Sequence, residues 1–202
     1  MYKVVAVTGG IGSGKSAVCR YLETQGVAVY DCDSATKRLY DEDQELLGFM
    51  LDAFGDRILT ASGTLDKKSL ASIIFSNPKD LELLESIVHP IVLADFNKWK
   101  SSVPNDWKGY VQKEPFVVME SAIILSKPLF DGSYDAAVFV DAPLEERIKR
   151  AAKRDGCAQE QIASRISNQS FDMSKVSAVI ENDGDLASLQ SKTDIIFKSL
   201  YL

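Results

Sequence analysis

One short segment near the amino terminus carries the clearest chemistry in the sequence. Residues 9–16 read Gly-Gly-Ile-Gly-Ser-Gly-Lys-Ser and match the pattern G-x-x-x-x-G-K-[ST], between a strand-like run at Val4–Val7 and a helical pattern. Glycines let successive backbone N–H groups point inward at an anion, and the helix that follows adds its positive dipole end. The alternative is a glycine-rich turn with a surface lysine. We predict a phosphate-binding loop.

The last two residues of this loop have side chains suited to separate tasks. Lys15 carries a charge that would reach the β- and γ-phosphates of a nucleotide. The hydroxyl of Ser16 would complete the shell of a Mg²⁺ ion that keeps most of its waters. The pattern alone leaves open what happens to the phosphate.

Two carboxylates follow the second strand-like run, Val27–Tyr30. Ligands of doubly wound sheets bind beyond the carboxyl ends of the strands, so Asp31 and Asp33 are expected beside the phosphate loop, facing the same way if the chain stays extended. Such a carboxylate could accept the proton of an acceptor hydroxyl or hold the metal through water. The alternative is an acidic turn that caps a helix starting near Ser34. Cys32 between them is interpreted as a packing residue.

Three arginines share one face of a predicted helix in the last third of the chain. Arg147, Arg150 and Arg154 stand at i, i+3 and i+7. Arginine suits the clamping of phosphoryl groups because its planar fork stays charged and donates two N–H groups at once. The alternative is a solvated helix whose arginines pair with Glu145 and Glu146, and Arg147 fits that alternative best.

The single histidine, His89, precedes Pro90 at what the pattern indicates is a helix end. Proline has no backbone N–H and favours a helix boundary at the residue before it. Two interpretations stay open: a histidine that interacts with the helix dipole, and a contact to an acceptor substrate.

Short apolar runs indicate the fold class. They occur at Val4–Val7, Val27–Tyr30, Phe116–Met119, Ala137–Val140 and Asp194–Phe197, and they are typical of strands buried on both faces. Helical patterns separate them. Strands that alternate with helices predict an α/β fold around a parallel sheet with right-handed crossovers.

The stretch between the second and third runs is too long for one crossover. It has helical patterns of its own: one stops at Gly55, another follows Asp66, and a third begins with Asn77 as N-cap and Pro78 as first helical residue. Residues 34–109 are therefore predicted to form a mostly helical insertion.

Composition excludes several classes of function. The 202 residues are 46% hydrophobic and 26% charged, as in an ordinary globular protein, and the formal net charge of −6 gives no uniform field for nucleic acid. No apolar run approaches the roughly 20 residues of a membrane-spanning helix, and no signal peptide is recognisable. Cys19, Cys32 and Cys157 form no C-x-x-C pair. We expect a cytoplasmic protein without a nucleic-acid, membrane or obligate protein partner.

Taken in chain order, these blocks resemble the dephospho-CoA kinase family, whose members finish coenzyme A synthesis. The phosphate loop is the most specific block, and the ordered combination covers the chain from end to end. The resemblance rests on residues 7–16, Asp31-Cys32-Asp33, Gly63-Thr64-Leu65-Asp66, His89-Pro90, Lys149-Arg150 with Arg154-Asp155, and Ile180-Glu181-Asn182-Asp183-Gly184.

The resemblance implies a P-loop nucleoside-monophosphate-kinase-like three-layer fold, with a five-stranded parallel sheet, a helical insertion and a lid. Its domain organisation would be a nucleotide-binding core of residues 1–33, 110–144 and 172–202, a helical acceptor domain for the CoA substrate at 34–109, and a lid at 145–171.

The resemblance also implies the reaction and the site. ATP with Mg²⁺ would be the phosphoryl donor and dephospho-CoA the acceptor, with Asp33 as general base at the ribose 3′-hydroxyl. Lys15 and Arg150 would stabilise charge on the transferring phosphoryl group, Arg154 would act from the lid, and His89 would lie on the acceptor side. The nucleotide-contacting residues would be Gly10, Ile11, Gly12, Ser13, Gly14, Lys15, Ser16 and Ala17 in the loop, with Asn182 and Gly184 around the adenine.

Two places depart from the family pattern. Ala17 stands where the family usually has threonine, so a backbone N–H contact survives but a hydroxyl contact does not. The segment Met119–Ala122 replaces one that usually contains Pro-Leu-Leu, and it brings Glu120, a carboxylate whose role the sequence leaves open.

Two rival functions share some of these features. Nucleotide and shikimate kinases also carry a strand-end D-x-D on this core. A nucleotide switch is the second rival, because Asp52–Gly55 matches D-x-x-G and Asn97-Lys98 begins like N-K-x-D. The switch motifs fail on inspection, since the first ends an amphipathic helix and Lys100 stands where a guanine-reading carboxylate belongs.

Overall fold

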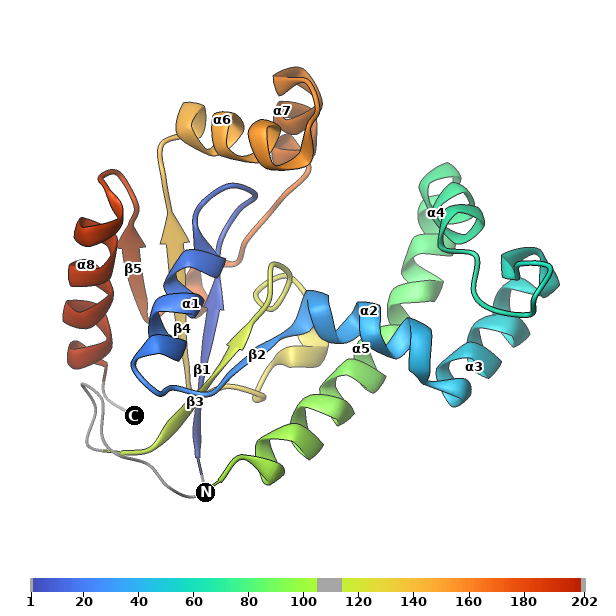
Figure 1. Ribbon diagram of the computed structural model, residues 1–202, viewed down its shortest axis with the longest axis horizontal. Helices are drawn as coiled ribbons and strands as arrows, with labels where there is room; N and C mark the ends of the chain where they lie inside the picture. Colours follow the sequence, from blue (N-terminus) through green and yellow to red (C-terminus); the bar gives the residue numbers. More distant parts are fainter. Residues whose placement is uncertain (1, 105–113, 201–202) are drawn as a thin grey trace. The chain divides into compact units, whose positions relative to one another are not determined.

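The computed structural model describes residues 2–104 and 114–200, and the chain divides into two compact units (Figure 1). The first unit comprises residues 1–31 with 102–202, and the second comprises residues 32–101. The predicted boundary between residues 109 and 110 lies outside the described residues.

The first unit is built on a parallel sheet. Its strands have the spatial order β2-β3-β1-β4-β5, and every neighbouring pair is parallel, which confirms the predicted five-stranded parallel sheet. In the register, Glu120 is the partner of both Val7 and Asp31, so the carboxyl ends of three strands meet. The strands are β1 (Lys3–Thr8), β2 (Val29–Asp31), β3 (Phe116–Glu120), β4 (Ala136–Asp141) and β5 (Ala178–Glu181).

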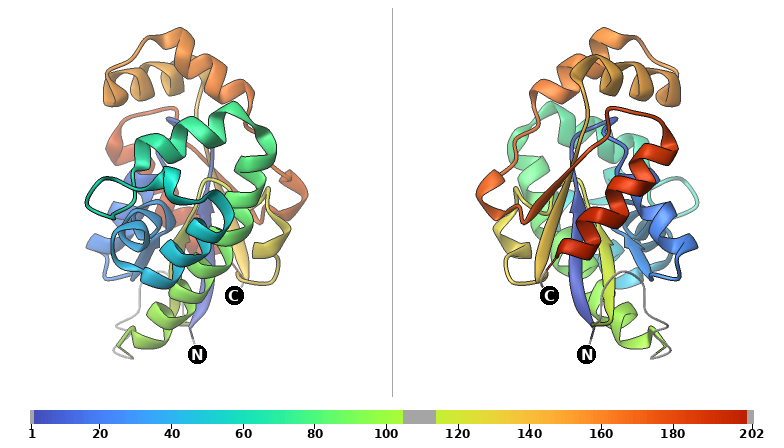
Figure 2. Two further views of the ribbon diagram at one scale, coloured as in Figure 1. Left: turned by 90° about the vertical axis from the view of Figure 1, so that its right-hand side faces the viewer. Right: turned by 90° about the vertical axis from the view of Figure 1, so that its left-hand side faces the viewer.

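The core of this unit lies between the sheet and two helices, α1 (Lys15–Thr24) and α8 (Leu186–Ser199), which cover the same face (Figure 2). Val5 and Val138 of the sheet and Leu22 of α1 belong to one buried apolar cluster. Phe116 and Phe197 stack in it with ring centroids 5.6 Å apart. All five residues of β3 are buried, so both of its faces are covered, which explains why the strand reads as a continuous apolar run.

The predicted strand at Asp194–Phe197 is wrong, because these residues lie in α8 and the fifth strand is Ala178–Glu181. Leu189, Thr193 and Phe197 are the buried residues of α8, four apart, whereas Ile195 is 62% exposed. The short apolar run is therefore one part of a helical stripe, and only the longer period distinguishes the two.

Two further helices follow β4 and pack against each other. They are α6 (Leu144–Asp155) and α7 (Gln159–Ser167), joined through a small buried cluster of Ala151, Ala152 and Ile162. Short 3-10 turns, η2 (Pro128–Phe130) and η3 (Met173–Lys175), precede β4 and β5.

The second unit is helical. It contains α2 (Cys32–Glu42), α3 (Gln44–Phe54), η1 (Asp56–Ile58), α4 (Lys67–Ser76) and α5 (Pro78–Ser102), the last of which ends at the unit boundary. Several predicted helix ends are confirmed: α3 stops at Gly55, α4 has Asp66 as a side-chain N-cap, and the Asn77 side chain accepts from the N–H of Lys79.

The predicted helix end at His89-Pro90 is wrong, because α5 continues through Pro90 to Ser102. Its buried residues, Leu84, Val88, Val92 and Phe96, keep a four-residue spacing on both sides of the proline. This continuous apolar stripe holds the helix together despite the missing N–H of Pro90. His89 is therefore mid-helix, which rules out the interaction with a helix terminus.

Within the described ranges, 2–104 and 114–200, no helix is long and apolar enough to cross a membrane.

Candidate active site

The phosphate loop links β1 to α1 and has the conformation that its glycines permit. Gly9, Gly12 and Gly14 have φ of 145°, 76° and 105°, which L side chains rarely adopt. Gly14 is the N-cap of α1, so the helix begins at Lys15 as predicted. The Nζ of Lys15 donates to the carbonyl oxygen of Gly9 at 2.9 Å, which places its charge against the loop.

Two buried hydroxyl groups, one just before this loop and one within it, have no hydrogen-bond partner in the described part of the chain. They are Oγ1 of Thr8, the last residue of β1, and Oγ of Ser13, which is 1% exposed. Buried polar groups in native proteins nearly always have a partner. Both hydroxyls are therefore able to hydrogen-bond with a polar ligand or with a water molecule.

Asn182 ties the loop after β5 to the phosphate loop. Its side-chain Nδ2 donates to the backbone carbonyl of Ser13 at 2.8 Å, and the residue is buried. Gly14 lies directly against it, because a Cβ placed on Gly14 would overlap the Nδ2 atom. Asn182 therefore contacts the phosphate loop itself, and Gly184 lies two residues further on at the surface.

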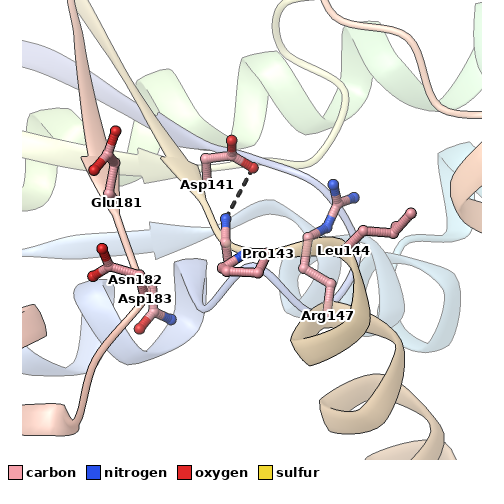
Figure 3. A pocket seen from close by; sticks show the side chains of 8 residues that line it. Asp141, Pro143, Leu144, Arg147, Glu181, Asn182 and Asp183 are labelled. Atoms are coloured by element: carbon pink, nitrogen blue, oxygen red, sulfur yellow. Dashed lines mark hydrogen bonds between the residues drawn. The ribbon is translucent and has the colours of Figure 1, made fainter.

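A pocket of about 500 Å³ opens beside the phosphate loop, at the carboxyl ends of β4 and β5 (Figure 3). Leu144 and Arg147, from the start of α6, line one side of it, and Glu181, Asn182 and Asp183 line the other. Asp141, Ala142 and Pro143 lie between them. Strand carboxyl ends are where doubly wound sheets bind nucleotides.

Glu120 is hydrogen-bonded to the phosphate loop. The Oγ of Ser16 donates to its Oε1 at 2.7 Å, and Glu120 is only 8% exposed. Burial raises the pKa of the Glu120 carboxyl, the hydrogen bond from Ser16 opposes this, and the nearby Asp31 carboxyl raises the pKa further. Burial and Glu120 also raise the pKa of the Cys19 thiol. The unexplained carboxylate thus lies beside the predicted metal-binding hydroxyl.

The chain does not stay extended after β2. The strand ends at Asp31 and α2 begins at Cys32, so Asp31 and Asp33 do not project alike from one strand, and the helix starts two residues before the expected Ser34. Asp33 is an exposed residue in the first turn of α2 and belongs to the second unit. Its role as general base stays a prediction.

Arg147 is not a solvated residue paired with the neighbouring glutamates. Its Nε donates to the backbone carbonyl of Ile11 in the phosphate loop at 3.1 Å, while Glu146 pairs with Lys149. The interpretation of Arg147 as the solvated member of the helix is therefore wrong. Sequence spacing could not reveal this, because the two partners are 136 residues apart.

The other two arginines of α6 differ in their surroundings. Nη1 of Arg150 is buried and has no hydrogen-bond partner within residues 2–104 and 114–200, so this nitrogen has an unused N–H donor. Arg154 is largely exposed and binds Asp155. The hydrogen bond from Arg154, with a second from Arg165, lowers the pKa of the Asp155 carboxyl to about 2.

Comparison with known proteins decides between the kinases that share this core. A sequence profile described as "Dephospho-CoA kinase" matches residues 3–188. The chain belongs to the dephospho-CoA kinase family. Dephospho-CoA kinases of Aromatoleum aromaticum and Bacteroides fragilis are 32% and 36% identical over 95% and 90% of this chain, and these matches cover 90% and 85% of the relatives. Both therefore align over nearly their whole length.

Solved structures agree with the fold. A protein of Thermus thermophilus matches with a TM-score of 0.79 and 28% identity, covering 99% of this chain and 98% of its own. A dephospho-CoA kinase from Campylobacter jejuni matches with a TM-score of 0.67, covering 98% of this chain and 96% of its own; at 20% identity this likeness concerns the fold alone.

Membership of the dephospho-CoA kinase family confirms the predicted fold and activity. The chain is an ATP-dependent kinase that phosphorylates dephospho-CoA in coenzyme A synthesis. The rival interpretations, a nucleotide or shikimate kinase and a nucleotide switch, are thereby set aside.

The sequence gives no sign of one further contact to the phosphate loop. The side chain of Gln169, just after α7, accepts a hydrogen bond from the N–H of Ile11 at 2.8 Å. No local pattern marks a single glutamine as such a partner.

Proposed function

We propose that this chain transfers the γ-phosphoryl group of ATP, as its Mg²⁺ complex, directly and in line to the ribose 3′-hydroxyl of dephospho-CoA. The observation that carries the proposal is the phosphate loop. Its glycines at positions 9, 12 and 14 have positive φ, and the buried hydroxyls of Thr8 and Ser13 have no hydrogen-bond partner among the residues that the structure describes. Family membership supplies the acceptor.

We assign the stabilisation of the transferring phosphoryl group to Lys15 and Arg150. Phosphoryl transfer spreads negative charge over the oxygens of the moving group, so fixed positive charge lowers the barrier. Lys15 is held against the loop carbonyls, and Arg150 has a buried nitrogen with no partner within the described ranges. Both are proposed to stabilise the transferring group, while loop amides of residues 10–17 bind the phosphates.

The residues present fit a magnesium ion. Ser16 Oγ and the Glu120 carboxylate lie together at 2.7 Å, and Asp31 is the register neighbour of Glu120. No group of three or more His, Cys, Asp or Glu side chains forms a metal cage within the described residues, but Mg²⁺ needs only one or two carboxylates besides phosphates. We assign Ser16 to the ion, with Glu120 and Asp31 on its carboxylate side. When bound, Mg²⁺ would neutralise charge on the phosphates.

The acceptor side is assigned to three residues, Asp33, His89 and Arg154. Asp33 is proposed to accept or orient the proton of the 3′-hydroxyl, His89 to contact the acceptor, and Arg154 to assist from the lid at residues 145–171. Asn182 and Gly184 are proposed to border the adenine, beside the pocket between α6 and β5. A cytoplasmic location is also proposed, supported by Cys19, Cys32 and Cys157, none of which forms a disulfide.

The test is ADP formation from ATP and Mg²⁺ with and without dephospho-CoA, with the product identified by mass. ADP release should depend on dephospho-CoA, and an analogue whose 3′-hydroxyl is replaced by hydrogen should give no product. Transfer to shikimate or to a nucleoside monophosphate, but not to dephospho-CoA, would refute the proposal. So would a preference for GTP with no transfer at all.

The role of Asp33 is tested separately by Asp33→Asn. Asp52→Asn serves as a matched control, because Asp52 is an exposed carboxylate on α3 of the same unit. Turnover should fall in the first variant alone, with ATP binding retained. Equal turnover in the two variants would remove Asp33 from the mechanism.

A further inference from the structure

The third residue of the phosphate loop, Ile11, is held by residues outside the loop. Its N–H donates to Oε1 of Gln169 at 2.8 Å, and its carbonyl accepts from Nε of Arg147 at 3.1 Å. Its side chain packs against the apolar cluster of α6 and α7 that includes Ala151 and Ile162. Figure 1 shows this helix pair above the loop that joins β1 to α1. The N–H and the carbonyl of Ile11 are thus both hydrogen-bonded by residues of the α6–α7 segment, which we define as residues 144–169.

The residues on either side of Ile11 are in equally close contact with Arg147. A Cβ on Gly10 would overlap the Arg147 guanidinium, and a Cβ on Gly12 would overlap the Arg147 backbone carbonyl. Gly12 also has φ of 76°, whereas Gly10 does not have a positive φ. The glycine at position 10 is therefore needed for the close approach of Arg147 rather than for its own backbone conformation.

We propose that Arg147 and Gln169 are positioning residues that set the shape of the phosphate loop from the α6–α7 segment. We call their contacts with Ile11 the Ile11 clamp. A glycine-rich loop without such contacts would have to lose conformational entropy when it orders around a phosphate. The Ile11 clamp orders the loop beforehand, so it raises the affinity for phosphate-bearing ligands and links the position of α6 and α7 to that affinity.

Two variants remove the clamp from either side. Gln169→Met keeps the size of the side chain but removes the acceptor, and Arg147→Met removes the Nε donor. Lys153→Met and Gln159→Met are matched controls at exposed positions of α6 and α7. Each clamp variant should weaken binding of inorganic tripolyphosphate and of ADP by about fivefold, the effect of one net hydrogen bond, and the controls should not.

Tripolyphosphate separates loop positioning from other roles of Arg147, which also lines the pocket. If Arg147 acts by touching the base, tripolyphosphate affinity will not change in Arg147→Met. If it acts only as a charge near the phosphates, Gln169→Met will bind tripolyphosphate normally. Either result overturns the proposal.

Amide hydrogen exchange gives a readout that needs no ligand. The Ile11 N–H should be protected in the unaltered chain, exchange at least about tenfold faster in Gln169→Met, and regain protection in Gln169→Glu, which keeps an acceptor oxygen. Unchanged Ile11 exchange in Gln169→Met would also overturn the proposal. Because neither readout involves dephospho-CoA, the result is independent of the acceptor assignment.

Discussion

The contact between Gly14 and Asn182 makes Gly14→Ala an informative substitution. Gly14 has φ of 105°, and a Cβ there would overlap the Asn182 side chain, whose Nδ2 donates to Ser13 at 2.8 Å. Two costs should therefore add. An L side chain in the positive-φ region costs about 1–2 kcal/mol. Displacing Asn182 leaves a buried carbonyl unsatisfied, which costs about 1–3 kcal/mol.

The sum predicts that Gly14→Ala lowers the free energy of unfolding by about 2–5 kcal/mol. Gly26→Ala isolates the first cost. Gly26 has φ of 86°, and apart from its chain neighbours no heavy atom of the described residues lies within 4 Å of an added Cβ. That control should lose only about 1–2 kcal/mol. Urea denaturation with matched m-values measures both.

A third variant tests the cause directly. In an Asn182→Ala background, Gly14→Ala has no amide to displace, so its additional cost should fall to the level of Gly26→Ala. A coupling between the two substitutions is the expected signature of contact. Equal losses for Gly14→Ala and Gly26→Ala in the unaltered background would refute the reasoning.

Four further predictions concern the reaction and the core. Asp33→Asn should lower kcat by about 100-fold or more while leaving the KM for ATP within about twofold, as expected for a lost general base; steady-state kinetics that show only a raised KM would contradict this. Lys15→Ala should lose about 3 kcal/mol or more of transition-state stabilisation, seen as a fall in kcat/KM of about 150-fold, and a near-normal rate would exclude the assigned role. Glu120→Gln should raise the Mg²⁺ concentration needed for half-maximal activity without weakening the binding of metal-free ATP, and an unchanged Mg²⁺ titration would remove Glu120 from the site. Phe116→Ala should lower the free energy of unfolding by about 3–5 kcal/mol, because the ring is fully buried against Phe197. A loss below about 1 kcal/mol in urea denaturation would contradict this, since it would mean that neighbouring side chains fill the cavity.

Local sequence patterns were sufficient for the parts of the molecule that depend on neighbouring residues. The phosphate loop is recognisable because its glycines, Lys15 and Ser16 must occur at fixed spacing between a strand and a helix. Helix starts at Asp66 and Asn77 were predictable because a capping side chain binds backbone N–H groups only two or three residues away. The same dependence on neighbouring residues explains the two wrong predictions, the strand at Asp194–Phe197 and the helix end before Pro90. Four residues are too few to show a helical period, and a proline by itself favours the end of a helix.

The sequence by itself determined the class of chemistry, the parallel sheet and, through the order of its blocks, the family. Only the tertiary structure decided which side chains meet at the phosphate loop. Ser16 bonds Glu120 across 104 positions, Arg147 bonds Ile11 across 136, and Gln169 bonds Ile11 across 158. Pairs so distant are brought together by strand register and by the packing of α6 and α7, which no local spacing encodes.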